Sequence, residues 1–260
     1  MLLQGKVALI TGGGSGIGKA TALLMAREGC KVAVLDRVEA RDEETLAEIE
    51  RGGGEGLLLA ADVANQQEME AAVGQVVARW GRLDIVFANA GINGVWAPLD
   101  ELALAEWNET LTINLTGTFL AVRAALPALR ERGGSVIITS SINGNRVFSN
   151  TGATAYSCSK AAQVAFAKMV ALEVAKHKIR VNVICPGGIR TNIGQNTEQR
   201  DLEKVREPAE YPEGTIPLTD GGPGCPAQVA RLVLFLASDA SDLITGTEIY
   251  IDGAESLLQG

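Results

Sequence analysis

Residues 6–36 read KVALITGGGSGIGKATALLMAREGCKVAVLD and contain three structural patterns in succession. An apolar run over 6–11 predicts a buried strand, and the helical periodicity that follows the glycines predicts a helix. A second apolar run over 31–36 predicts another strand that ends in a carboxylate. The stretch is therefore a strand-helix-strand unit with a glycine-rich turn, residues 12–18, between the first strand and the helix.

This turn follows Thr11 and contains Gly12, Gly16 and Gly18 in the spacing Gly-x-x-x-Gly-x-Gly, which differs from the common Gly-x-Gly-x-x-Gly fingerprint. Glycines let the backbone approach a pyrophosphate, whose charge is stabilised by free N–H groups and the dipole at a helix start. Asp36, at the end of the next strand, lies where a carboxylate accepts hydrogen bonds from ribose hydroxyls. Together these features indicate a dinucleotide site.

A second pattern places Tyr156 and Lys160 four residues apart, which puts both side chains on one face of a helix. A tyrosine ordinarily titrates near pH ~10, and a neighbouring ammonium lowers its pKa by favouring the phenolate. Such a pair could transfer protons near neutral pH. Tyrosine and lysine also occur at this spacing by chance, so the pair gains its meaning from the dinucleotide site that precedes it.

These motifs, with Asn89-Ala90-Gly91, Asn114, a serine near 141 and Pro186-Gly187, resemble those of the short-chain dehydrogenase/reductase family in its short single-domain branch. The resemblance extends from Gly5 to the ending at 245–253. It implies an α/β Rossmann fold with a doubly wound, seven-stranded parallel sheet. It also implies an oxidoreductase that transfers hydride between a nicotinamide and a secondary alcohol or ketone.

The resemblance assigns the catalytic roles. Tyr156 would be the acid/base, Lys160 would lower its pKa and hold the nicotinamide ribose, and Ser141 would hydrogen-bond the reacting oxygen. Asn114 would position a water that links Lys160 to solvent. Its alternative role is that of a packing amide with satisfied hydrogen bonds, since a buried amide is costly without partners.

The resemblance also assigns the cofactor contacts. They are Gly12, Ser15, Gly16, Ile17, Gly18, Asp36, Arg37, Asp62, Val63, Asn89, Ala90, Gly91, Tyr156, Lys160, Pro186, Gly187, Ile189 and Thr191. A carboxylate at Asp36 binds two ribose hydroxyls and repels the 2′-phosphate of NADP, so NAD is predicted as the cofactor and NADP is less favoured. The adjacent Arg37 could attract that phosphate.

The serine departs from the family's spacing. Thirteen residues before Tyr156, where the family commonly has its catalytic serine, the chain has Asn143, whereas Ser141 lies fifteen residues before it. We therefore interpret 142–155 as a loop two residues longer than usual. Ser140 is the alternative, and we expect it to be a buried hydroxyl bonded to backbone on the other side of the strand.

Apolar strand-like runs alternate with helical segments along the whole chain, which predicts a parallel sheet covered by helices on both faces. The runs are 6–11, 31–36, 57–61, 84–88, 134–140, 179–185 and 247–251. We expect a single dinucleotide-binding catalytic domain over 1–260. Residues 192–225 break the alternation and resemble the family's substrate lid, the alternative being a surface excursion without function.

Composition excludes several classes of function. A net charge of −8 disfavours nucleic acid and anionic membranes as partners. One histidine excludes a Ser-His-Asp hydrolase or a histidine metal site, and the four scattered cysteines predict neither a disulfide framework nor zinc. No signal peptide and no apolar run of ~18 residues is found, so a soluble cytoplasmic protein without metal is expected.

Some alternatives stay open. A catalytically silent NAD-binding regulator or scaffold would keep the glycine turn and Asp36 but could lose the proton-transfer residues. An isomerase or dehydratase of the family's longer branch is disfavoured by chain length and glycine spacing. The family resemblance also implies a homotetramer. The substrate is a small alcohol or ketone, with a sugar, a steroid, a 3-oxoacyl thioester and a small diol all possible.

Overall fold

A computed structural model describes residues 1–37, 39–207 and 216–259 and contains the predicted parallel sheet. Its seven strands lie in the order β3-β2-β1-β4-β6-β7-β9. Their bounds are β1 Val7–Thr11, β2 Lys31–Asp36, β3 Gly56–Ala60, β4 Ile85–Ala88, β6 Gly134–Thr139, β7 Ile179–Pro186 and β9 Glu248–Ile251. Each of the seven predicted strands is therefore confirmed, with ends that agree to within one residue.

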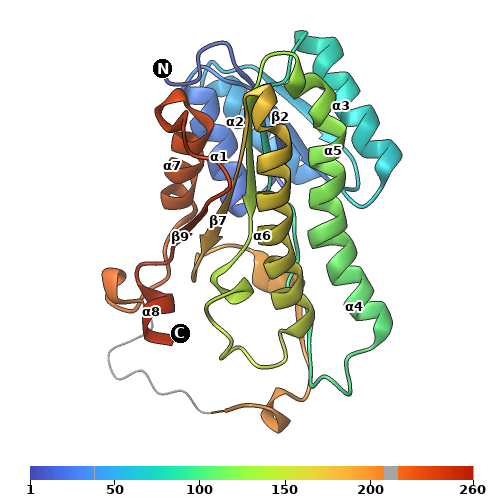
Figure 1. Ribbon diagram of the computed structural model, residues 1–260, viewed down its shortest axis with the longest axis vertical. Coiled ribbons are helices and arrows are strands. Elements are labelled where there is room, and N and C mark those ends of the chain that lie inside the picture. The colour runs from blue at the N-terminus through green and yellow to red at the C-terminus, as the bar shows by residue number, and fades with distance from the viewer. Residues whose placement is uncertain (38, 208–215, 260) are drawn as a thin grey trace.

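Helices cover both faces of this sheet (Figure 1). They are α1 Gly16–Arg27, α2 Glu39–Arg51, α3 Gln66–Trp80, α4 Leu104–Leu111, α5 Gly117–Arg130, α6 Thr154–Val174, α7 Pro226–Ala237 and α8 Glu255–Gln259. Side chains alternate along β1, so Val7 and Leu9 join the core beneath α3, α5 and α6, while Ala8 and Ile10 join the core beneath α1 and α7. Both faces are buried, which explains the continuous apolar runs of the strands.

The order of the strands fixes where a ligand can bind. β1 pairs with β2 on one side and with β4 on the other, so the chain reverses its direction of winding at β1. In open α/β sheets, ligands bind beyond the carboxyl ends of the strands at such a reversal. The glycine-rich turn leaves β1 at this point and leads directly into α1.

A second, two-stranded sheet joins the predicted lid to the rest of the molecule. β5 (Gly94–Trp96) pairs in parallel with β8 (Thr197–Gln199), and neither strand is predicted from the sequence because both are short and β8 is polar. Short 3-10 turns make up much of the remaining described lid. Residues 208–215, which include the turn formers Pro208, Pro212 and Gly214, lie outside the described residues.

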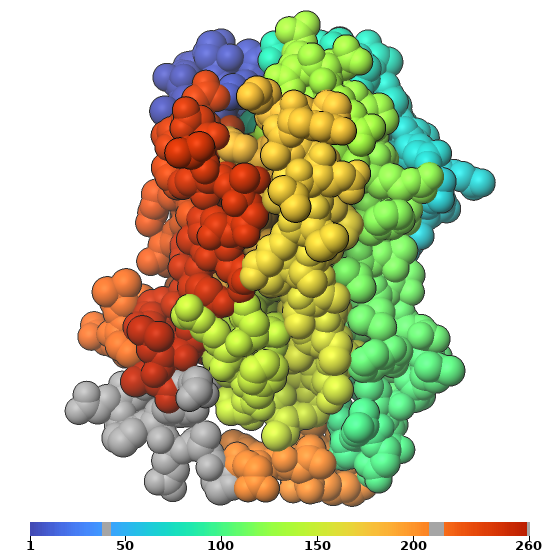
Figure 2. Space-filling view, in the orientation of Figure 1, coloured from blue at the N-terminus to red at the C-terminus, as the bar shows by residue number. Residues whose placement is uncertain are grey.

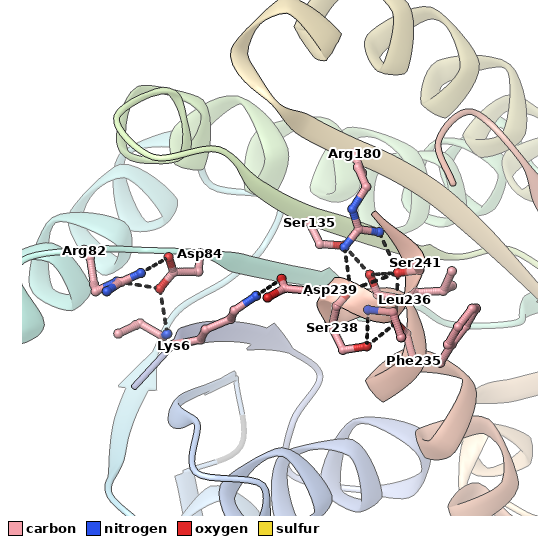
Figure 3. Close-up of polar contacts among 12 residues, drawn as sticks. Lys6, Arg82, Asp84, Ser135, Arg180, Phe235, Leu236, Ser238, Asp239 and Ser241 are labelled. Atoms are coloured by element: carbon pink, nitrogen blue, oxygen red, sulfur yellow. Dashed lines mark hydrogen bonds and ion pairs between the residues drawn. The ribbon is translucent and has the colours of Figure 1, made fainter. Parts of the chain in front are cut away.

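A polar network closes the opposite, amino-terminal edge of the sheet (Figure 3). Asp84 accepts hydrogen bonds from the Val7 N–H at 2.9 Å and from Arg82 at 2.6 and 2.8 Å. Lys6 pairs with Asp239, and Arg180 donates to the Ser241 hydroxyl at 2.8 Å. These contacts join the starts of β1, β4 and β7 to the end of α7, so their role is structural.

One helical stretch, Leu104–Arg130, is apolar and long enough to cross a membrane by length and composition alone. It combines α4, a π-helical turn at Thr112–Thr116 and α5. In this fold Leu120, Ala125 and Leu129 of α5 pack in the core against the sheet. Length and composition are therefore weak evidence for a membrane span here, because a core helix meets the same criteria.

Candidate active site

A cavity of about 530 Å³ lies at the carboxyl ends of the central strands. This volume is in the range of small-molecule and cofactor sites. All the predicted catalytic and cofactor-binding residues line it except Gly18 and Asn114. The structure therefore brings these predicted residues together around one cavity.

The glycine-rich turn forms one wall and has the geometry of a diphosphate cradle. Gly12 has φ +66°, a conformation that favours glycine, and a Cβ on Gly18 would lie 2.0 Å from the Gly12 carbonyl oxygen. Gly18 is thus needed for close packing beneath the turn, which is why it does not line the cavity. At the start of α1 the Ser15 side chain makes no capping hydrogen bond, and the first turn holds no acidic residue. The free N–H groups there fit an anionic diphosphate.

Two carboxylates stand at the adjoining end of the cavity, where β2 and β3 end. Asp36 accepts a hydrogen bond of 2.7 Å from the Arg37 N–H. The Arg37 guanidinium turns toward Asp62, with 3.5 Å between Nη1 and Oδ2. Asp62 also accepts from the Ala64 N–H at 2.9 Å, which fixes the turn after β3.

The Asn89-Ala90-Gly91 turn after β4 ties three strand ends together. The N–H groups of Asn89 and Ala90 donate to the Thr11 hydroxyl at 3.0 and 3.1 Å. The Thr139 hydroxyl donates to the Asn89 side-chain oxygen at 3.1 Å. This turn both holds the sheet edge and lines the cavity.

Tyr156 and Lys160 lie on the cavity side of α6 and are 8% and 3% exposed. The Lys160 Nζ is 5.6 Å from the centroid of the Tyr156 ring and donates a hydrogen bond of 2.9 Å to the Thr139 carbonyl oxygen. Ser141 lies close enough to the Tyr156 hydroxyl to lower the pKa of the phenol. The predicted trio of hydroxyl, phenol and ammonium therefore meets in one place.

Burial is the main cause of the pKa shifts of Tyr156 and Lys160. Burial raises the pKa of Tyr156, the Ser141 hydrogen bond opposes this, and the neighbouring Cys185 adds to the rise. Burial also lowers the pKa of Lys160 to about 8. The predicted lowering of the phenol's pKa by Lys160 is not found: the net shift of the Tyr156 pKa is upward, because burial disfavours the phenolate.

Ser140 and Ser141 are distinguished by their partners. The Ser140 hydroxyl is buried and donates to the Lys160 carbonyl oxygen at 2.8 Å, as expected for a hydroxyl bonded to backbone. The Ser141 hydroxyl accepts from the Asn143 N–H at 3.1 Å and so caps a short 3-10 turn. Asn143 accepts a hydrogen bond from the Asn150 side chain at 3.2 Å, which joins two positions between Ser141 and α6.

Asn114 lies in the π-helical turn behind the cavity and is fully buried. Its amide oxygen accepts from the Ile92 N–H at 2.8 Å, and its amide nitrogen donates to the Ile92 carbonyl at 2.9 Å and to the Ser159 hydroxyl at 3.0 Å. The side chain thus has the satisfied packing contacts of the alternative prediction. It stays close to the trio, since a Cβ on Gly91 would lie 3.0 Å from its oxygen and 3.5 Å from Lys160 Nζ.

The sequence predicts segments 142–155 and 192–225 near the substrate but singles out none of their side chains as a substrate contact. We call the part of the cavity lined by residues that follow β4, β6, β7 and β9 the half beyond Tyr156. Besides Asn143 its residues include Asn93, Trp96, Ile142, Asn150, Asn192, Ile193, Asn196 and Glu255. Glu255 begins α8 and accepts a hydrogen bond of 2.7 Å from the Gly188 N–H. Burial raises the pKa of its carboxyl group. Its only sequence signal is a carboxylate shortly after the last strand, which is not specific to a site.

The sequence is similar to those of known reductases over nearly its whole length. A family model described as enoyl-(acyl carrier protein) reductase matches residues 12–254. The 3-oxoacyl-[acyl-carrier-protein] reductase FabG of Thermotoga maritima is 38% identical over 254 residues, which cover 97% of this chain and 98% of that protein. Levodione reductase of Leifsonia aquatica is 36% identical over 255 residues, with 96% and 94% coverage.

A solved structure agrees closely with the fold. The crystal structure of a 3-ketoacyl-ACP reductase from Sinorhizobium meliloti 1021 matches with a TM-score of 0.94 and 50% sequence identity. The match covers 97% of this chain and 99% of that one. The fold is thus shared over nearly the whole of both chains.

Proposed function

The chain belongs to the short-chain dehydrogenase/reductase family, and from that premise we propose that it is an NAD-preferring oxidoreductase acting on a secondary alcohol or its ketone. The observation that carries this proposal is the meeting of Ser141, Tyr156 and Lys160 beside a glycine turn built for a diphosphate. When bound, the nicotinamide supplies the hydride chemistry.

Each member of the trio has a distinct role. Tyr156 takes the proton from the alcohol during oxidation and returns it to the carbonyl oxygen during reduction. Ser141 donates a hydrogen bond to the reacting oxygen, which strengthens as negative charge develops there. Lys160 holds the nicotinamide ribose. Among the described residues, the Asn114 amide oxygen accepts only the Ile92 N–H, so it has a lone pair left to hold a water that would link Lys160 to solvent.

The preference for NAD rests on Asp36 and on the position of Arg37. The Asp36 carboxylate stands at the end of β2, where it would repel a 2′-phosphate. The Arg37 guanidinium, the group that could offset this repulsion, is directed toward Asp62. This pair is exposed and weak, so the preference is a matter of degree.

The organisation of the molecule is part of the proposal. We infer one catalytic domain over 1–260, with 192–225 as a substrate lid whose first part is held over the cavity by the pairing of β5 with β8. Exposed apolar side chains on α4, α5 and α6 support the predicted homotetramer. They are Leu104, Phe119, Met169 and Leu172. The four free cysteines fit a reducing cytoplasm.

A catalytically silent regulator has little support. The proton-transfer residues are all present and assembled around the cavity. The relatives reported above are named as reductases. We therefore retain the oxidoreductase as the function of the chain.

The test is the absorbance of reduced nicotinamide while a panel of secondary alcohols is screened with NAD and with NADP. Tyr156→Phe serves as the blank, since it keeps the ring and removes only the hydroxyl. We expect turnover with NAD that falls at least about 100-fold in this variant. Turnover that is unchanged in Tyr156→Phe would refute the mechanism.

A further inference from the structure

The lining of the cavity beyond Tyr156 indicates what kind of substrate fits there. Its polar side chains are mainly uncharged amides. They are Asn93, Asn143, Asn150, Asn192 and Asn196. An asparagine amide offers two donors and an acceptor without a net charge. Such a lining matches a substrate that carries several hydroxyl groups.

Charged groups are few in this half. Among the described residues that line the cavity, Asp36, Arg37 and Asp62 stand at the far end, beside β2 and β3. Of the other two, Lys160 is buried and bonded to the Thr139 carbonyl. Glu255 is therefore the charged side chain that this half presents to a substrate.

The Glu255 carboxylate has one oxygen engaged and one available. Oε2 accepts from the Gly188 N–H at 2.7 Å and would lie 2.4 Å from a Cβ on Gly187. Within the described ranges, no hydrogen bond or ion pair is made by Oε1. A half-buried carboxylate oxygen gains from a donor that replaces water.

The helix that carries Glu255 is held in place. Asp252 accepts from the Ser256 N–H at 3.0 Å, and Arg146 donates to the Ser256 hydroxyl at 3.3 Å. The Arg146 guanidinium also stacks 3.4 Å from the Tyr250 ring centroid. Figure 2 shows the yellow-green segment between β6 and α6 against the red C-terminal segment. These contacts fix the position of α8 and so of the Glu255 carboxylate.

Two cations of the lid that could attract an anionic substrate are already paired with carboxylates. Arg200 of the lid is paired with Glu106 at 2.9 Å, and Lys204 is paired with Glu101 at 2.6 Å and Asp201 at 3.1 Å. The net charge of −8 also opposes the approach of an acidic carrier protein. These observations disfavour an acyl thioester on a phosphorylated or protein carrier.

Building on the proposed function, we propose that the substrate is a small uncharged molecule with several hydroxyl groups, and that Glu255 accepts a hydrogen bond from a hydroxyl away from the reacting carbon. Polyols and their keto forms have this chemistry. Glu255 then sets substrate specificity, while Ser141 and Tyr156 act on the reacting oxygen.

The experiment compares xylitol, sorbitol and cis-1,2-cyclohexanediol with cyclohexanol and, in the reducing direction, acetoacetyl-coenzyme A. Binding to the NAD- or NADH-loaded full-length protein is measured by calorimetry, and turnover by nicotinamide absorbance. The variant is Glu255→Gln, which keeps an acceptor for Gly188. Glu131→Gln, exposed at the end of α5, is the matched control.

We expect at least one polyol to bind and turn over better than cyclohexanol and the thioester. Glu255→Gln should raise its KM about 10-fold with a smaller change in kcat, and should raise KM for cyclohexanol much less. Better binding of cyclohexanol or the thioester, no polyol binding, or an equal effect of Glu255→Gln on every substrate would overturn the proposal. Turnover that depends on Tyr156 for any panel member would still leave the proposed function intact.

Discussion

The Lys160 ammonium donates a hydrogen bond of 2.9 Å to the backbone oxygen of Thr139 at the end of β6. This contact joins α6 to the central sheet and fixes the Lys160 Nζ 5.6 Å from the centre of the Tyr156 ring. Because the side chain is 3% exposed, the folded state carries a buried cation at neutral pH. Function and stability therefore make opposite demands on Lys160: activity needs the ammonium in the site, and burying its charge lowers the free energy of unfolding.

Replacing Lys160 with Met should separate these two demands. Burial lowers the pKa of Lys160 from its ordinary 10.5 to about 8. Below pH 8 the folded state bears the full cost of the buried charge, and between about 8 and 10.5 the unfolded state binds more protons, so wild-type stability rises with pH. The free energy of unfolding of Lys160→Met, minus that of wild type, should fall over this window by roughly 3 kcal/mol.

Urea unfolding at a series of pH values measures this difference. Activity should fall at least about 100-fold in Lys160→Met at every pH, because the ribose contact and the proton path are lost. A stability difference between the two proteins that is flat from pH 7 to 10.5 would show that Lys160 is not desolvated.

The pH profile of turnover should depend on direction. Burial raises the pKa of Tyr156 above its ordinary 10.0, with the Ser141 hydrogen bond acting against the rise. Oxidation needs the phenolate and reduction needs the phenol. The kcat/KM for oxidation should therefore climb through the alkaline range, while that for ketone reduction stays flat up to pH 10 and declines only above it. Identical profiles in the two directions would contradict Tyr156 as the acid/base.

The strands, the glycine turn and the Tyr156–Lys160 pair show which features of the molecule the sequence predicts. The seven strands and the glycine turn follow from local patterns, because apolar runs and glycines act through their immediate neighbours in the chain. The helical spacing also placed Tyr156 beside Lys160. The direction of the Tyr156 pKa shift was not predictable, because it depends on desolvation by residues distant in sequence.

The residues in the half of the cavity beyond Tyr156 could not be predicted from local sequence patterns either. Asn143 and Glu255 are separated by more than a hundred residues and share a cavity only through the fold. Neither occurs in a local motif. The pairing of β5 with β8 is likewise tertiary, since strands of three residues carry almost no periodicity.

Ser141 and Ser140 should respond differently to truncation. Ser141→Ala removes the donor to the reacting oxygen, so kcat should fall about 100-fold or more with little change in the dissociation constant for NAD. Ser140→Ala removes a buried bond to the Lys160 carbonyl and should cost about 1 kcal/mol of stability. Steady-state kinetics with urea unfolding of both variants measures these effects. A larger loss of kcat in Ser140→Ala would reverse the assignment of the catalytic serine.

Asp36 should control the choice of cofactor. Asp36→Ala removes both the ribose acceptor and the repulsion of a 2′-phosphate, so the ratio of kcat/KM for NAD over NADP should fall at least about 10-fold. Asp36→Asn is the matched comparison, since it keeps an acceptor and removes the charge, and should retain more activity with NAD. A ratio near one in the wild-type enzyme would already disprove the preference.

At the opposite edge of the sheet, Asp84 should matter for stability alone. It is 6% exposed and satisfies the Val7 N–H and the Arg82 guanidinium at the starts of β4 and β1. Asp84→Ala leaves both donors without a partner and should lower the free energy of unfolding by about 2–3 kcal/mol.

Arg82→Ala in the Asp84→Ala background should restore part of this loss, because it removes one charge left without a partner. Activity per folded molecule should be unchanged, since none of the residues labelled in this network (Figure 3) lines the cavity. Urea unfolding and kcat measured on the same samples test both statements, and a loss of kcat at unchanged stability would mean that this edge is coupled to the site.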